Sequence, residues 1–203
     1  MSTESRPLRV VAVSGSLTDP SRTTALVEAI ADAFGAAITT ETHVISLNQL
    51  GPHLGGTLSR NQLPDVAEAE LERIEAADLL IVATPVYRAS FTGLFKYLFD
   101  FVDQYALVDT PVLLSATGGS DRHALIIEHQ LRPLFAFFQS LVLPLGVYAQ
   151  DSDFENYKIT NEQLTERIEK AVARALPLVK SSFAERQEVE RALAGEDISD
   201  ATE

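Results

Sequence analysis

Cysteine is absent from the 203-residue sequence, which excludes disulfides, thiolate catalysis, Cys-ligated zinc and iron–sulfur clusters. Basic residues are scarce: 16 Lys and Arg stand against 29 Asp and Glu, and the net charge of -13 disfavours binding to nucleic acid or acidic membranes. The chain also lacks an apolar run that could span a bilayer, an N-x-Ser/Thr sequon and the apolar part of a secretory signal. We therefore expect a cytoplasmic protein that binds neither nucleic acid nor membrane.

Several enzyme motifs are missing as well. The nucleotide-binding patterns G-x-G-x-x-G and G-x-x-x-x-G-K-[ST] do not occur, and neither does the hydrolase pattern G-x-S-x-G or the zinc pattern H-E-x-x-H. The four histidines lack metal-ligand spacing. We therefore predict no metal site and assign no catalytic acid, base or nucleophile.

Short β-branched runs alternate with longer amphipathic stretches, and this pattern predicts an α/β fold with a parallel sheet between two layers of helices. With 46% hydrophobic residues, the chain is long enough for one compact domain. The runs predict five strands, at residues 8–13, 42–47, 78–84, 112–116 and 143–148.

The stretches between these runs predict the helices. Helices are expected up to residue 34, from Pro64, from an N-cap at Ser90, over 120–140 with an interruption at Pro133, and over 160–180 with Thr160 as N-cap. Two of these helices, over 90–102 and 120–140, are apolar nearly all round, which favours at least a dimer.

Segments without a clear period complete the domain organisation. Residues 48–63 contain three glycines and are expected to be a long surface loop. We assign 1–7 to an N-terminal extension, 8–180 to the domain, and 181–203 to an acidic tail, unpacked or loosely docked.

In open α/β sheets, ligands bind beyond the carboxyl ends of the strands, where the strand order reverses. The first segment at such an end combines small hydroxyl residues with the start of a helix and one fixed positive charge, which suits a phosphate. Its candidate residues are Ser14, Ser16, Arg22, Thr23 and Thr24. An ordinary Ser/Thr-rich helix cap would have the same composition.

Two further segments at strand ends suit a planar ring. The proline-stiffened turn Pro85, Val86, Tyr87 and Arg88 follows the third strand, and Thr117, Gly118 and Gly119 follow the fourth and allow close approach to the backbone. Each is compatible with a simple turn, but the three segments should converge on one crevice. They indicate a flat heterocycle with a single phosphate, and FMN is the candidate.

Together these motifs resemble the flavodoxin-like NAD(P)H-dependent FMN reductases, most closely the reductase component of two-component alkanesulfonate and methanesulfonate monooxygenases. The resemblance covers about Arg9 to Lys180 and implies a doubly wound, five-stranded flavodoxin-like sheet. It implies that Ser16, Arg22, Thr23 and Thr24 hold the FMN phosphate, and that the segments 85–88 and 117–119 line the ring.

The resemblance also implies a mechanism. Hydride passes from NADH or NADPH to FMN, with NADH favoured, and reduced FMN then leaves for a partner flavin-dependent monooxygenase. His129 stands where related reductases have a tyrosine, in a π-type bulge near the flavin and the subunit interface of a tetramer.

Two other functions fit the same residues. One is a reductase that keeps FMN bound and passes electrons to quinones, azo dyes or metal oxyanions. The other is a flavodoxin-like electron carrier, which the charge of -13 suits, although the first loop lacks the flavodoxin form Thr/Ser-x-Thr-Gly-x-Thr.

Overall fold

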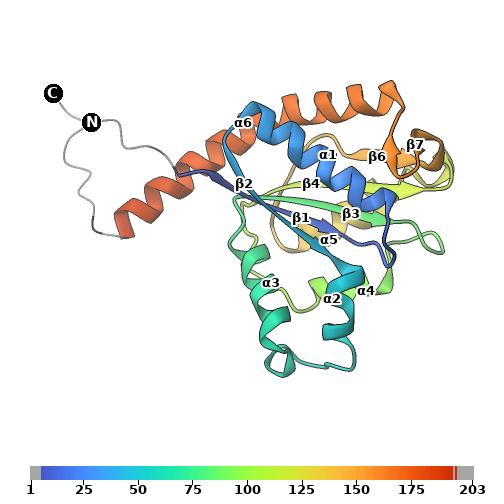
Figure 1. The fold of residues 1–203 in the computed structure, drawn as a ribbon. Helices are drawn as coiled ribbons and strands as arrows, with labels where there is room; N and C mark the ends of the chain where they lie inside the picture. Colours follow the sequence, from blue (N-terminus) through green and yellow to red (C-terminus); the bar gives the residue numbers. More distant parts are fainter. Residues whose placement is uncertain (1–5, 194, 196–203) are drawn as a thin grey trace.

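The computed structural model describes residues 6–193 and 195 and has a parallel sheet at its centre (Figure 1). The strands pair in the order β2-β1-β3-β4-β5, which is the flavodoxin-like order, so the predicted fold class is confirmed. The four long strands are β1 (Leu8–Ser14), β2 (Thr40–Ser46), β3 (Leu79–Pro85) and β4 (Pro111–Gly118).

The fifth position of the sheet is divided between two short strands. β5 (Leu141–Val142) pairs with the start of β4, and β6 (Val147–Gln150) pairs with its end. Pro144 lies between them and has no amide hydrogen to donate to a ladder. The predicted strand over 143–148 is therefore wrong as one continuous element, and its two parts both pair with β4.

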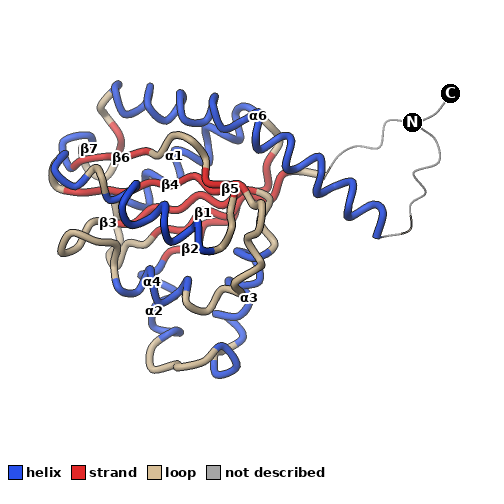
Figure 2. The backbone as a smooth tube through the Cα atoms, turned by 180° about the vertical axis from the view of Figure 1, so that it is seen from behind, coloured by secondary structure: helices blue, strands red, loops and turns tan. Residues whose placement is uncertain are grey.

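Helices cover both faces of the sheet (Figures 1 and 2). α1 (Arg22–Ala37) and α6 (Glu162–Leu193) pack on one face. The other face carries α2 (Leu47–Leu54), α3 (Asp65–Glu75), α4 (Gly93–Phe99), a π-helical turn η3 (Ile127–Leu131) and α5 (Arg132–Phe137).

The central strands are apolar because they are buried on both faces. In β1, Val10 and Ala12 pack in the core under α1 and α6, whereas Val11 and Val13 pack in the core on the other face. This alternation explains why the strand sequence shows a continuous apolar run and no polar period.

The prediction of a surface loop over 48–63 is wrong in its first half, where α2 lies. Leu47, Leu50 and Leu54 bury one face of this helix at helical spacing. Gly51 is a packing position, because a Cβ there would lie 2.5 Å from a methyl carbon of Leu94 in α4. The glycine signals a close approach of two helices and not a loop.

Two predicted helices are shorter than expected. Thr92, not Ser90, caps α4, because Ser90 is engaged in a tight backbone turn with Tyr87. The segment over 120–140 is not one α-helix: a short 3₁₀ turn η2 (Asp121–His123) precedes η3 and α5. The amide of Arg132 donates to the carbonyl of Ile127, the five-residue spacing of a π-helix, so the predicted π-type bulge around His129 is confirmed.

Part of the apolar surface that suggested an oligomer is covered within the chain. Phe99 of α4 meets Phe135 of α5 edge to face, with 5.0 Å between ring centres. By contrast, Leu125 and Phe137 are 62% and 65% exposed.

The predicted end of the last helix at residue 180 is wrong, because α6 continues to Leu193. Its extension is docked: Phe183 is buried, and the guanidinium of Arg186 donates to the carbonyl of Ala77 at 2.7 Å and to the hydroxyl of Thr110 at 2.9 Å. Asn161 caps the start of α6 by accepting from the amide of Gln163, in place of the predicted Thr160. Residues 1–5 of the predicted extension 1–7, and residues 194 and 196–203 of the predicted tail, lie outside the described residues.

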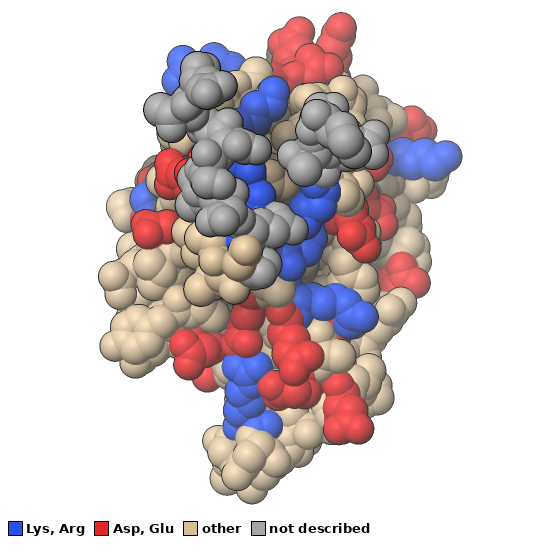
Figure 3. Space-filling view, turned by 90° about the vertical axis from the view of Figure 1, so that its left-hand side faces the viewer, with Lys and Arg blue, Asp and Glu red and all other residues tan. Residues whose placement is uncertain are grey.

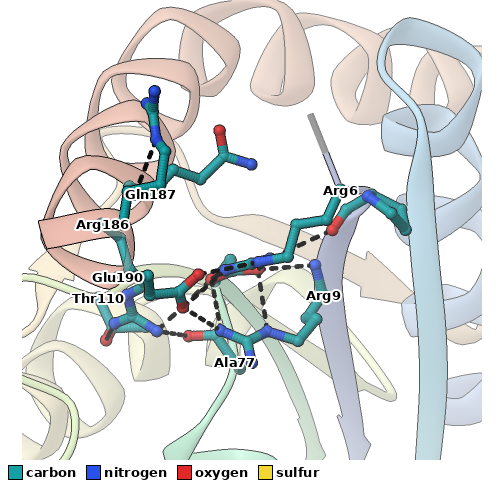
Figure 4. A network of polar contacts seen from close by, with 10 residues as sticks. Arg6, Arg9, Ala77, Thr110, Arg186, Gln187 and Glu190 are labelled. Atoms are coloured by element: carbon teal, nitrogen blue, oxygen red, sulfur yellow. Dashed lines mark hydrogen bonds and ion pairs between the residues drawn. The ribbon is translucent and has the colours of Figure 1, made fainter. Parts of the chain in front are cut away.

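A charged cluster fastens this extension of α6 to the sheet (Figure 4). The carboxylate of Asp78, whose side chain is fully buried, accepts from the guanidinium of Arg6 at 2.5 and 3.0 Å and from the amide of Arg9 at 2.9 Å. Glu190 of α6 bonds the same two arginines at 2.9 Å. Figure 3 shows this end of the molecule, where Lys and Arg side chains lie near the centre with Asp and Glu around them.

Candidate functional site

The carboxyl ends of β1, β3 and β4 open onto one cleft of about 330 Å³, as the strand order requires. The loops that follow these three strands all contribute to its lining. Nine of the twelve predicted flavin-site residues are among the lining residues: Ser16, Arg22, Thr23, Pro85, Val86, Tyr87, Thr117, Gly118 and Gly119.

The loop after β1 ends in a capped helix. The hydroxyl of Ser21 accepts from the amides of Thr23 and Thr24, and Arg22 is the first residue of α1. The hydroxyl of Ser16 donates to the carbonyl of Thr18 at 3.1 Å, a local bond within this loop. The positive end of the α1 dipole and the Arg22 side chain therefore meet at one end of the cleft, which favours an anion there.

Two hydroxyl pairs hold this loop in place. Thr23 and Thr117 lie 2.6 Å apart through their hydroxyl oxygens, and this contact ties the start of α1 to the end of β4. Ser14 and Thr24 pair in the same way at 2.8 Å, and neither of them is among the lining residues. These two residues, predicted as phosphate ligands, connect the end of β1 to the first turn of α1.

The turn after β3 is held tightly. Tyr87 and Ser90 exchange two backbone hydrogen bonds, of 2.9 and 3.2 Å. The two residues between them, Arg88 and Ala89, have φ values of 52° and 68°, a conformation that non-glycine residues adopt only at a cost in free energy. This turn places Tyr87, 47% exposed, at the cleft, whereas Arg88 is exposed and is not among the lining residues.

Gly118, the last residue of β4, and Gly119, which follows it, are required for different reasons. A Cβ on Gly118 would collide with the hydroxyl of Tyr148, which donates to the carbonyl of Ser120 at 2.5 Å. Burial, together with the nearby Asp121, raises the pKa of Tyr148, so this hydroxyl stays protonated as a donor. Apart from its chain neighbours, no atom of the described residues lies within 4 Å of a Cβ on Gly119, so a ligand can reach the Gly119 backbone from the cleft.

Five lining residues were not predicted: Thr18, Pro20, Ser21, Asp151 and Tyr157. Asp151 follows β6, so the rule of strand ends, applied to the last strand as well, would have found it. Its carboxylate lies 3.0 Å from the guanidinium of Arg22. Tyr157 lies in the hairpin of β7 (Phe154–Glu155) and β8 (Lys158–Ile159). No pattern in the sequence predicts that this tyrosine lines the cleft.

His129 lies away from this cleft. It is exposed and lines a separate, smaller pocket of about 190 Å³ together with Ala89, Arg122, His123 and Gln130. Ala89 belongs to the same turn as Tyr87, so both pockets border that turn.

Within the described residues, no group of three or more His, Asp or Glu side chains is arranged to hold a metal ion. No helix of that part of the chain has the length and apolar character needed to cross a membrane. The chemistry of the cleft is therefore that of hydroxyls, backbone amides, two tyrosines and one ion pair.

The residues present fit FMN. A helix start and one arginine meet at one end of the cleft, and the backbone of Gly119, after β4, can be approached closely. The cleft volume is in the range of small-molecule sites. One phosphate and one flat ring match this distribution of charge and open backbone better than a pyrophosphate does.

A flavodoxin-like sheet with such a cleft at its switch point defines a class of α/β proteins whose ligands combine a ring with a phosphate. The match to known families is more specific. Residues 8–155 match the family described as NADPH-dependent FMN reductase, and the chain belongs to that family.

Named relatives agree with this membership. The chain is similar to an NADH-dependent FMN reductase SfnF of Pseudomonas fluorescens, with 56% identity over 86% of this chain and 93% of that protein. It is 54% identical to an FMN reductase (NADPH) of Pseudomonas aeruginosa, over 85% of this chain and 92% of that protein. The crystal structure of an oxidoreductase from Corynebacterium diphtheriae superposes with a TM-score of 0.79 at 32% identity, covering 87% of this chain and 99% of that one. The prediction of an NAD(P)H-dependent FMN reductase is thereby confirmed.

Proposed function

We propose that the cleft at the ends of β1, β3 and β4 binds FMN for reduction by NADH or NADPH, and that reduced FMN is released to a separate flavin-dependent monooxygenase. The observation that carries this proposal is the convergence of three strand-end loops on one cleft with a single arginine at a helix start. Family membership supports the same reaction.

Each part of the cleft has a role in this proposal. Arg22, Ser16 and Thr23, with the amides at the start of α1, hold the phosphate. The turn at Pro85, Val86 and Tyr87 and the backbone of Thr117, Gly118 and Gly119 position the ring from two sides. Thr23 connects the two regions through its bond to Thr117, so the phosphate loop and the ring loop keep a constant spacing.

FMN supplies the hydride-accepting chemistry, and the chain supplies binding and orientation. The lining residues include no histidine and no lysine, and no general acid or base is needed for hydride transfer. The strained turn at Arg88 and Ala89 fixes the backbone of Tyr87 at the ring edge. The sequence has no dinucleotide fingerprint, and the nicotinamide would bind in this same cleft, beside the flavin.

The hydride donor and the recipient of reduced FMN complete the proposed reaction. Two relatives of similar identity are named for NADH and for NADPH respectively, so relatedness favours neither donor. The resemblance to reductase components of sulfonate monooxygenases supports such an oxygenase as the recipient of reduced FMN. A cytoplasmic location fits the supply of NAD(P)H.

We further propose that the chain forms a homo-oligomer, a dimer or tetramer, through the surface around η3 and α5. Leu125 and Phe137 are large, apolar and mostly exposed there, and His129 lies on the same exposed surface. Burying such side chains on a second copy would stabilise the assembly. Sedimentation equilibrium of the wild-type chain and of Phe137→Glu tests this proposal, and a monomeric wild type would contradict it.

The reaction is tested by anaerobic stopped-flow mixing of the chain and FMN with NADH and, separately, NADPH. We expect rapid loss of oxidised-flavin absorbance and, on gel filtration, flavin separated from protein. Bleaching with the flavin retained would instead favour a quinone, azo or metal-oxyanion reductase. Absence of bleaching with both donors would contradict the reductase and favour an electron carrier.

A further inference from the structure

A carboxylate lies beside the arginine at the phosphate end of the cleft. Arg22 is the one basic side chain among the lining residues that the structure describes, and Asp151 is the one acidic side chain. Their charged groups lie 3.0 Å apart, and the two side chains are 43% and 54% exposed. The side-chain charge of the cleft is therefore balanced before any ligand enters.

We propose that Asp151 competes with the flavin phosphate for Arg22, and that it thereby shortens the time for which FMN stays bound. This inference rests on the proposed function, since it concerns the same site. A reductase that delivers reduced flavin to another enzyme must release that flavin. The carboxylate of Asp151 promotes release because it pairs with Arg22 again when the phosphate leaves.

The backbone around Asp151 is held firmly, so the competing carboxylate stays close to Arg22. Asp153, two residues on, is buried, and its carboxylate accepts from the amide of Gln150 at 2.8 Å and from the side chain of Asn161 at 2.6 Å. Its carbonyl accepts from the amide of Thr160 at 3.0 Å. These bonds tie the turn that bears Asp151 to the start of α6.

Tyr157 restrains the arginine from another direction. The guanidinium carbon of Arg22 lies 5.9 Å from the centre of the Tyr157 ring, within the range of a cation–π contact. Tyr157 and Asn156 have φ values of 63° and 47°, the tight turn that brings the hairpin to the cleft. Arg22 is thus oriented by residues of the β6–α6 connection, which the sequence places more than a hundred positions away.

The ligand changes this balance. A phosphate monoester carries between about one and a half and two negative charges at neutral pH, and it offers a guanidinium two oxygens at once. It therefore displaces Asp151 from Arg22, but the displaced carboxylate remains beside the phosphate as a like charge. Both effects lower the affinity for the phosphate, and neither acts on the flavin ring.

The test compares Asp151→Asn with the wild type in FMN and riboflavin binding, measured by quenching of flavin fluorescence. Because the pair is partly exposed, we expect FMN to bind about three- to tenfold more tightly to Asp151→Asn, with the dissociation rate falling by a similar factor. Riboflavin, which has the same ring and no phosphate, should change by less than about twofold.

The control is Asp32→Asn, which removes the same charge from an exposed position of α1 about 15 Å along the helix from Arg22. It should leave FMN binding unchanged. An equal gain in this control would assign the effect to overall charge and overturn the proposal. So would an equal gain for riboflavin in Asp151→Asn, or no gain for FMN.

A double variant tests the competition itself. In an Arg22→Ala background, Asp151→Asn should tighten FMN binding by a smaller factor than in the wild-type background, because the like charge beside the phosphate is still removed but there is no arginine to compete for. A gain as large as in the wild-type background would mean that Asp151 acts on the phosphate alone, and the competition would be refuted. These measurements use equilibrium binding without NAD(P)H, so they stand even if the stopped-flow experiment contradicts the reductase.

Discussion

Replacing Asp78 by asparagine should destabilise the fold by about 3 kcal/mol, although Asp78 precedes β3 at the end of the sheet opposite the cleft. Its buried carboxylate bonds Arg6 and Arg9 and lies 3.6 Å from Arg186. Asparagine keeps the shape of the side chain and one acceptor oxygen but removes the negative charge. The three guanidinium groups then lie close together without the carboxylate that pairs with them.

The magnitude follows from burial. Breaking a buried ion pair by removing one partner costs about 3–5 kcal/mol. Here the arginine side chains are 26–39% exposed, so water partly compensates them, and the lower end of that range applies. For a chain of this length, about 3 kcal/mol corresponds to a fall in Tm of about 6–12 °C.

The effect should depend on pH in a defined direction. Burial alone would raise the pKa of Asp78, but hydrogen bonds from Arg6 and Arg9 outweigh it, so the pKa lies below its ordinary value. A group whose pKa is lowered on folding stabilises the protein above its unfolded pKa of about 4, and this contribution disappears as the pH falls through the folded value. The difference between wild type and Asp78→Asn should therefore be constant from pH 7 to about 5 and shrink below about 4.

Urea denaturation followed by circular dichroism measures the free energy of unfolding of the wild type and the variant. Repeating it between pH 7 and pH 3 measures how their difference depends on pH. Glu190→Gln is the matched control, because it removes a carboxylate that bonds the same arginines but is 43% exposed. It should cost less than about 1 kcal/mol. The reasoning fails if the two variants are equally stable, or if the Asp78→Asn difference persists unchanged at pH 3.

Three further outcomes are expected. Arg22→Ala should weaken FMN binding by about 1.5–3 kcal/mol while riboflavin binding changes little, and an unchanged FMN dissociation constant would remove Arg22 from the phosphate site. Gly118→Ala should destabilise the fold by about 1–3 kcal/mol by displacing the Tyr148 hydroxyl, and adding Tyr148→Phe should recover part of that loss; a double variant no more stable than Gly118→Ala would contradict the clash. Ala89→Gly should raise the free energy of unfolding by up to about 1 kcal/mol because it relieves the φ of 68°, whereas the same change at Ala69, inside α3, should lower it. Thermal denaturation distinguishes these two glycine variants.

The architecture of the central sheet could be predicted from short segments of the sequence. The apolar runs at β1, β3 and β4 and the periodic helices between them are local patterns, and the parallel architecture follows from their alternation. Predictions from local patterns were wrong where tertiary contacts decide the structure. Gly51 looked like a loop residue because its reason, the approach of Leu94, lies more than forty residues away.

In the candidate site, too, some residues could be predicted from local motifs, whereas others depended on tertiary contacts. Arg22, Tyr87 and the glycines after β4 were predicted because the strand-end rule connects each of them to a local motif. Which hydroxyls face the cleft was not predictable, since Ser14 and Thr24 belong to the same motif as Ser16 and Thr23 but bond one another and do not line the cleft. Only side-chain direction in the folded chain separates these pairs.

By itself, then, the sequence determined the class of fold, the three loops that meet at the cleft and the chemistry of a phosphate-bearing flat ligand, because each is encoded within a short stretch of residues. Tertiary structure alone decided that Asp151 and Tyr157 face Arg22, and that Arg6, Arg9 and Glu190 gather around Asp78. These contacts join positions 69 to 184 residues apart, and pairing over such distances depends on how the packed layers bring chain segments together. No local period or motif carries that information.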